Sequence, residues 1–341
     1  MIAHGGSGSA TYAHAHSLES ITKAEAPSEE YLRDRQGRRI SKLRISVTTA
    51  CDLACTYCRK VGDGPSHYSE KNLGPEEFER LAKAFVASGI RSIRVTGGEP
   101  TLRTDLLEIV QKLSGLGVPV GVTTNGVRLA ELAQGLREAG ATGVNVSLDS
   151  LDPETFRRIT GSGSLERVLA GIRAARMVGL ETKLNVVVLR GINDHEIDAF
   201  HDLSASADVE VRFLELMRIG TARELFEERF VPAAEIIARL SRRTRLKDVP
   251  VASDATAFRR DSLLGARLGF IAGESLPFCG SCSRIRLSST GSLRPCLFDP
   301  REIPLAGLSG RDLLQGIREG IQLKEASRPS QTPLAMHRIG G

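Results

Sequence analysis

Two sets of three cysteines are the residues of this chain whose type and spacing could do chemistry. The first set lies in the sequence CDLACTYC, with spacings of three and two residues, and the second set has spacings of two and thirteen. The six residues are Cys51, Cys55, Cys58, Cys279, Cys282 and Cys296. Thiolates are soft ligands that favour zinc or iron–sulfur clusters. A structural zinc ion takes four protein ligands, whereas three thiolates on a four-iron cluster leave one iron open to a substrate or cofactor.

The spacing alone leaves three kinds of site open. Each triplet could hold an iron–sulfur cluster, one triplet could bind zinc together with a histidine, or both triplets could share one zinc ion. A disulfide framework is disfavoured, because the cysteines form tight groups in a long chain with an α/β pattern.

The elements that position these cysteines follow from the hydrophobic pattern. Six apolar runs rich in β-branched residues predict strands, at 43–48, 92–96, 118–124, 143–148, 182–189 and 209–216. Helical spacing lies between them, as at 75–88 and 165–179, and Pro75 and Pro153 stand where helices should begin. Repeated strand–helix units predict a parallel sheet with right-handed crossovers. Because six units are fewer than the eight of a closed barrel, we expect an open, partial (β/α)6 barrel.

Polar residues follow the ends of these strands. The first strand leads into the first cysteine triplet, the second into Gly-Gly-Glu-Pro at 97–100, and the third into Thr-Thr-Asn-Gly at 123–126. The fifth strand contains Lys183 and Asn185. The carboxyl ends of barrel strands build active sites, so these residues predict one shared site.

The pattern changes after residue 245 to short strands and turns, with a hairpin predicted at 284–298 and a last helix near 310–323. We therefore expect a disordered arm at 1–30, a barrel at 31–245, a β-rich C-terminal domain at 246–331 and a tail at 332–341. Arg284 and Arg286 alternate with Ile285 and so share one face of their strand.

Composition restricts the function. The chain has 341 residues, 41% of them hydrophobic, and a net charge of +5, which is compatible with an anionic ligand. No apolar run could cross a membrane, and the N-terminus has no signal-peptide pattern, so we expect a cytoplasmic protein. A clustered basic stripe with interleaved aromatic residues, typical of nucleic-acid binding, is missing from the sequence.

The motifs resemble those of a known family. The C-x₃-C-x₂-C triplet with Tyr57 before its last cysteine, followed by Gly-Gly-Glu-Pro, resembles the radical S-adenosylmethionine (SAM) enzymes. The second triplet within FCGSCSRIRLSSTGSLRPCLF and the Gly-Gly end resemble one branch, the GTP 3′,8-cyclases of molybdenum cofactor biosynthesis. The likeness runs from about residue 32 to the end of the chain. It implies a radical SAM barrel whose C-terminal extension carries a second cluster.

The resemblance also implies roles for individual residues. The first triplet would hold one 4Fe–4S cluster, and Cys279, Cys282 and Cys296 would hold another. SAM would bind the open iron of the first cluster and contact Tyr57, Gly97, Gly98, Glu99, Ser147 and Met217. GTP would meet the second cluster and contact Arg44, Arg94, Thr123, Lys183, Arg284, Ile285 and Arg286. Catalytic roles would fall to Arg284, Arg286, Gly340 and Gly341, with the tail reaching the active site.

The implied reaction begins when a one-electron reductant reduces the first cluster, which cleaves SAM to a 5′-deoxyadenosyl radical. That radical would remove H3′ of GTP, and the C3′ radical would attack C8 of guanine. The product would pass to cyclic pyranopterin monophosphate synthase, and the enzyme would be a monomer or homodimer. Two alternatives stay open: a radical SAM enzyme acting on another nucleotide or a peptide, and a zinc-stabilised binding protein without turnover.

Overall fold

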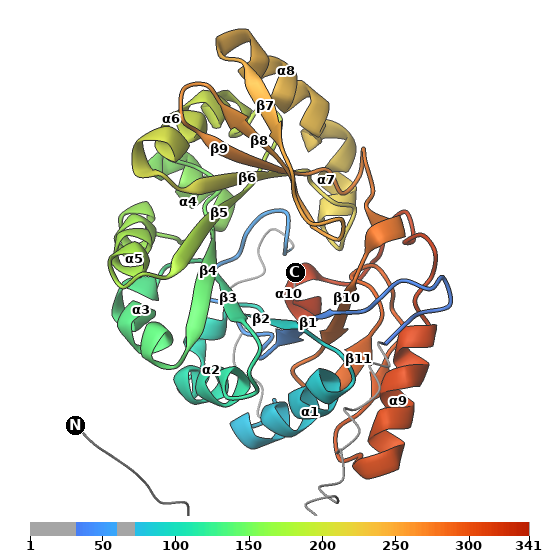
Figure 1. Cartoon of the computed structure of the whole chain (residues 1–341). Helices are drawn as coiled ribbons and strands as arrows, with labels where there is room; N and C mark the ends of the chain where they lie inside the picture. The colour runs from blue at the N-terminus through green and yellow to red at the C-terminus, as the bar shows by residue number, and fades with distance from the viewer. Residues whose placement is uncertain (1–31, 60–71, 341) are drawn as a thin grey trace, which may run out of the picture. The chain divides into compact units, whose positions relative to one another are not determined.

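The strands and helices alternate along the first two thirds of the chain, as the hydrophobic pattern predicts (Figure 1). The computed structural model describes residues 32–59 and 72–340, so the predicted N-terminal arm and Gly341 lie outside the described residues. The six predicted strands are confirmed as β1 (Lys42–Ser46), β2 (Ser92–Thr96), β3 (Val120–Thr124), β4 (Ala141–Ser147), β5 (Glu181–Val187) and β6 (Glu210–Leu214). The helices of this part are α1 (Pro75–Ala87), α2 (Leu106–Ser114), α3 (Leu129–Glu138), α4 (Pro153–Thr160), α5 (Leu165–Met177) and α6 (Ile197–Ala207).

Helix α1 shows why these segments form where they do. Pro75 occupies the first turn, where its missing N–H costs nothing, and Glu76 and Glu77 lie near the positive end of the helix dipole. Phe78, Leu81, Ala82 and Phe85 recur at helical spacing and are buried. The helix therefore covers the sheet with one apolar face.

The elements after β6 include both helices and strands, and their strands extend both edges of the same sheet. They are α7 (Ala222–Arg229), α8 (Ala233–Arg243), β7 (Leu246–Val249), β8 (Phe258–Ser262), β9 (Arg267–Ile271), β10 (Arg284–Leu287), β11 (Ser292–Arg294), β12 (Ile303–Pro304), α9 (Gly310–Gln322) and α10 (Met336–Ile339). The strand order is β12-β11-β10-β1-β2-β3-β4-β5-β6-β9-β8-β7. β10 pairs in parallel with β1, and β9 pairs in parallel with β6. The predicted six-stranded parallel barrel is thus extended by one parallel strand at each edge.

The sheet is an open, curved barrel with helices on its outer side, which confirms the predicted fold class (Figure 1). The predicted hairpin is confirmed as β10 and β11, which pair antiparallel, and the predicted last long helix is α9. Helix α10 returns the chain to the inside of the curve (Figure 1). The described residues, 32–59 and 72–340, lie in one compact unit, and the domain boundary expected at residue 245 stays a prediction. No helix among the described residues has the length and apolarity needed to span a membrane.

Candidate active site

A cavity of about 320 Å³ lies where the parallel strands end. All six cysteines line it, and so do polar residues that follow β2, β3, β4 and β6, together with Asn185 within β5. Both triplets therefore face one chamber although more than 200 residues separate them in the sequence. The residues predicted after β2, β3 and β4 therefore line one cavity with both triplets, whereas Lys183 does not, and the assignment of this cavity as the shared site stays a prediction.

The loop with the first triplet is fastened to its neighbours by main-chain hydrogen bonds. The amides of Ala54 and Thr56 donate to the carbonyls of Thr160 and Ile159 at the end of α4, both at 2.9 Å. The Gly-Gly-Glu-Pro segment lies against the residues before Cys51: the amide of Gly98 donates to the Thr48 carbonyl at 2.7 Å. These bonds position the loop relative to β2 and α4.

Gly98 is required by this close approach. A Cβ atom built there would lie 2.2 Å from the carbonyl oxygen of Ala50, which is main chain and cannot rotate away. The motif therefore has a steric reason in this fold, apart from any contact with a cofactor.

Glu99 joins two strand ends through a buried carboxylate. It accepts hydrogen bonds from the Thr101 amide (2.9 Å), the Thr101 hydroxyl (2.6 Å), the Thr124 hydroxyl (2.8 Å) and the Asn125 amide (2.6 Å). Burial raises its pKa, and these donors oppose that shift. Glu99 lines the cavity and also positions the loops after β2 and β3.

Tyr57 connects the first triplet to the end of β4. Its hydroxyl donates to Asp149 at 2.5 Å, and the other carboxylate oxygen of Asp149 accepts the Val187 amide at 2.8 Å. Burial raises the pKa of Asp149 to about 6, against the effect of these two hydrogen bonds. The predicted SAM contact Tyr57 is thus fixed in the cavity wall, beside Cys55 and Cys58.

The thiols of the two triplets lie in different electrostatic surroundings. Burial raises the pKa of Cys51 to about 12, and it also raises the pKa of Cys55 and Cys58. At Cys282, burial acts in the same direction, but the charges of Lys324 and Arg284 outweigh it and lower the pKa to about 7. The cations beside Cys282 therefore favour its thiolate.

A row of arginines crosses the sheet beside these cysteines. Arg286 on β10 is in register with Arg44 on β1, which is in register with Arg94 on β2. Burial, followed by repulsion from Arg286, Arg284 and Arg94, lowers the pKa of Arg44 well below its ordinary value. Mutually repelling buried cations are costly unless an anion joins them, so this row is suited to a polyanionic ligand.

Further residues extend this positive surface. Arg212 on β6 lines the cavity and pairs with Glu210 at 2.5 Å. Arg328 also lines it, forms an ion pair with Glu274 at 2.9 Å and stacks over Phe298. The sequence reasoning missed both arginines. The alternation of β6 places Arg212 on the same face as Leu214, another residue of the cavity wall, and this was a usable signal.

Most predicted site residues do line the cavity. Besides the cysteines they are Arg44, Tyr57, Gly97, Gly98, Glu99, Thr123, Ser147, Met217, Arg284 and Arg286. Gly340 does not line the cavity itself, but its carbonyl accepts a hydrogen bond from the guanidinium of Arg286, which does. Gly341 lies outside the described residues.

Three predicted GTP contacts are placed differently. The Ile285 side chain is fully buried in the core and is not part of the cavity wall. Lys183 pairs with Glu181 at 2.7 Å and lines a second pocket, near the amino ends of β5 and β6. Arg94 lines neither pocket, and its guanidinium lies against Gly121 on β3. The contacts of these three residues with a nucleotide stay predictions.

The donors present suit the cofactors that the sequence implies. All six cysteines are free and partly buried, in two sets of three. The carbonyl oxygen of the Asn185 side chain is buried at the cavity wall, without a hydrogen-bond partner among the described residues. Within residues 32–59 and 72–340, no three His, Cys, Asp or Glu side chains converge as on a single metal ion. Thiol-only sets with an adjacent polar cavity fit iron–sulfur clusters that leave an iron open to a ligand.

An open parallel barrel with a three-cysteine loop after β1 and a polar cavity beside it defines the class of radical SAM enzymes. The Radical SAM superfamily matches residues 45–204, and the Molybdenum Cofactor Synthesis C family matches residues 209–332. The solved structure of native anSMEcpe with bound AdoMet shares the fold, with a TM-score of 0.57, 18% identity and coverage of 83% of each chain.

Sequence relatives are more specific. GTP 3′,8-cyclase of Synechocystis sp. is 40% identical over 322 residues, which cover 94% of this chain and 98% of the relative. GTP 3′,8-cyclase of Moorella thermoacetica is 39% identical over 324 residues, which cover 91% and 100%. The chain belongs to the GTP 3′,8-cyclase family of radical SAM enzymes. This membership favours SAM and 4Fe–4S clusters over the zinc alternative.

Proposed function

We propose that the protein is a GTP 3′,8-cyclase, which closes a bond between C3′ and C8 of GTP in molybdenum cofactor biosynthesis. In this proposal Cys51, Cys55 and Cys58 hold the cluster that binds SAM. The second triplet, Cys279, Cys282 and Cys296, holds a cluster that meets the guanine. When bound, SAM and the reduced first cluster would supply a 5′-deoxyadenosyl radical, which would take H3′ to give 5′-deoxyadenosine. The C3′ radical would add to C8, and a further electron from the reductant and a proton would complete the cyclised nucleotide.

The observation that carries the proposal is the arginine row beside the second triplet, of which Arg44 and Arg286 line the cavity. Arg286, Arg44 and Arg94 are in register on three adjacent strands, and Arg284 lies next to the Cys282 thiol, with its guanidinium 3.5 Å from Sγ. Guanidinium groups match phosphate oxygens in charge and geometry. A nucleotide with its base at the second triplet would thus find cations for its phosphates along the row.

The rest of the wall positions and encloses the reactants. Glu99 and Tyr57 use their polar groups to hold the loops after β2, β3 and β4, so the SAM side of the cavity is rigid. Met336 and His337 of the C-terminal segment line the cavity, and Arg286 holds the Gly340 carbonyl. Preorganised walls of this kind supply positioning and exclude water, which are the protein's share of a cofactor reaction.

The proposal includes partners. A one-electron reductant must reduce the first cluster, and the cyclised nucleotide would pass to cyclic pyranopterin monophosphate synthase. Free thiol ligands and a reductant are compatible with the cytoplasm, where thiols stay reduced. The working unit would be a monomer or a homodimer.

Anaerobic turnover tests this function. The protein is reconstituted with iron and sulfide, supplied with SAM, a strong reductant and GTP, and followed by mass spectrometry. We expect GTP-dependent formation of 5′-deoxyadenosine together with a cyclised guanine nucleotide. 5′-Deoxyadenosine without a GTP product would redirect the search to another nucleotide or a peptide, and no SAM cleavage by iron-loaded protein would overturn the enzyme assignment.

A further inference from the structure

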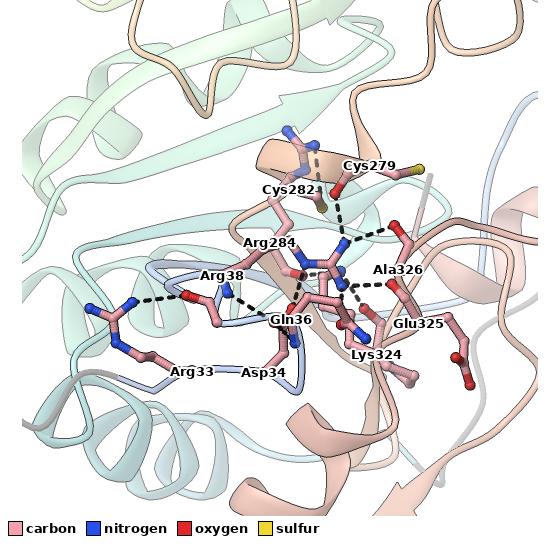
Figure 2. Close-up of polar contacts among 12 residues, drawn as sticks. Arg33, Asp34, Gln36, Arg38, Cys279, Cys282, Arg284, Lys324, Glu325 and Ala326 are labelled. Atoms are coloured by element: carbon pink, nitrogen blue, oxygen red, sulfur yellow. Dashed lines mark hydrogen bonds and ion pairs between the residues drawn. The ribbon is translucent and has the colours of Figure 1, made fainter.

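Two cations with buried side chains, from opposite ends of the chain, lie next to the segment that carries Cys279 and Cys282 (Figure 2). Arg38 comes from the segment before β1, and Lys324 follows α9. Neither residue belongs to the strand or turns that carry the cysteines. Lys324 is only 4% exposed, and the Arg38 side chain is 8% exposed.

Lys324 bridges the two segments that carry Cys282 and Cys296. Its Nζ donates to the carbonyl of Arg284 at 3.0 Å and to the carbonyl of Pro295 at 2.9 Å. Arg284 is two residues after Cys282, and Pro295 immediately precedes Cys296. One ammonium group therefore fixes the separation of two of the three cysteine segments.

Arg38 holds the third segment. Its guanidinium donates to the carbonyl of Cys279 at 2.7 Å and to the carbonyls of Glu325 and Ala326 at 2.6 and 3.3 Å, next to Lys324 (Figure 2). It is neutralised by Asp34, whose carboxylate lies 2.6 Å from its Nε. The two cations together thus connect all three cysteine segments to the chain after α9.

The two cations differ in whether a neighbouring carboxylate neutralises their charge. Arg38 has a buried carboxylate partner, whereas Lys324 bonds to two main-chain carbonyls and has no carboxylate partner among the described residues. Lys324 lines the same cavity as Cys282 and Cys296. A buried cation without a counterion is costly in an empty site and favourable beside a negatively charged group.

We propose that Lys324 is a positioning residue for the second cluster, which sets the spacing of Cys282 and Cys296 and supplies a compensating positive charge. This inference rests on the proposed assignment of a 4Fe–4S cluster to the second triplet. A fixed cation stabilises the more negative, reduced cluster, so Lys324 raises its reduction potential. Residues that hold metal ligands in place typically change metal affinity 10- to 100-fold when mutated.

The test uses the full chain with Cys51, Cys55 and Cys58 replaced by alanine, so that only the second triplet binds iron. In this background the Lys324→Met variant should lose its iron at a chelator concentration about 10- to 100-fold lower than the parent that retains Lys324. The midpoint potential of the remaining cluster, from a redox titration followed by electron paramagnetic resonance, should become more negative. Lys324→Arg should keep the potential close to that of Lys324, because the charge is retained.

Two controls separate this role from general damage to the fold. Lys112→Met removes a lysine on α2 that pairs with Glu76 and Glu79, and it should change neither measurement. Lys324→Met in a chain whose second triplet is replaced by alanine should hold first-triplet iron normally. A potential and iron retention equal to those of Lys324 would overturn the inference, and so would loss of first-triplet iron. Failure of the Lys324 parent to bind iron at the second triplet would instead refute the proposed cluster assignment.

Discussion

The arginine row makes a quantitative prediction for Arg286→Met. Burial, partly opposed by Cys296 and reinforced by Arg284, lowers the pKa of Arg286 to about 10. Arginine is charged at neutral pH in both the folded and the unfolded chain, and a tenfold change in proton affinity corresponds to about 1.4 kcal/mol. Holding this residue charged therefore costs the folded, nucleotide-free protein about 3 kcal/mol.

Methionine removes that cost together with the hydrogen bond to the Gly340 carbonyl, which contributes about 1 kcal/mol. We therefore expect Arg286→Met to be at least as stable as the parent without nucleotide. With nucleotide the sign reverses, because a charge-assisted hydrogen bond to phosphate contributes about 1.5–3 kcal/mol. The affinity for GTP should fall roughly 10- to 100-fold.

Anaerobic thermal unfolding with and without GTP measures both effects. At a GTP concentration 100 times the parent's Kd, the parent gains about 2.7 kcal/mol, whereas a variant with a 100-fold weaker Kd gains about 0.4 kcal/mol. Arg137→Met, on the exposed face of α3, removes the same charge outside the cavity and should retain the parent's gain. An undiminished gain in Arg286→Met, or a large loss of stability without GTP, would refute the reasoning.

Three further changes test separate parts of the site. Gly98→Ala places Cβ 2.2 Å from the main-chain oxygen of Ala50, so we expect the free energy of unfolding to fall by about 1–3 kcal/mol and the iron content of the first triplet to fall as well. Normal iron loading would show that the loop can move to accept the methyl group. Gly121→Ala places Cβ 2.3 Å from Nη1 of Arg94, whose side chain can move away. The free energy of unfolding should therefore change by less than about 1 kcal/mol, whereas the affinity for GTP should fall because Arg94 is displaced. An unchanged affinity in equilibrium dialysis would show that Arg94 is not part of the nucleotide site. Deletion of Gly340–Gly341 should leave both clusters intact by iron analysis but abolish the cyclised product, and full turnover would show that the tail takes no part.

The local sequence was sufficient to predict the repeating part of the fold. Strand and helix periods, Pro75 and Pro153 at helix starts and the turn within 284–298 act over a few residues, and the structure agrees with each. Cysteine spacing likewise specified two thiol-rich sites, because the ligands of each set lie close in the chain. Alternation also predicted that Arg284 and Arg286 would share a face, and both line the cavity.

The tertiary structure decided which strands became neighbours. β10 lies about 240 residues after β1, yet it pairs with β1 in parallel and in a register that sets Arg286 beside Arg44. Register between distant strands depends on which faces are buried together, and no local pattern specifies it. The same limit applies to Lys183. It shares one face of β5 with Asn185, but it lies near the amino end of the strand, where it pairs with Glu181 instead of lining the cavity.

The convergence of Arg38 and Lys324 on the second triplet was also invisible in the sequence. Each looks like an ordinary surface cation in its own segment. Only the packing of the segment before β1 and of the chain after α9 against the segments that carry the second triplet buries their side chains. Sequence therefore determined the elements and the ligand types of this protein. Long-range packing decided where the charges meet, because burial and strand register are properties of the whole fold.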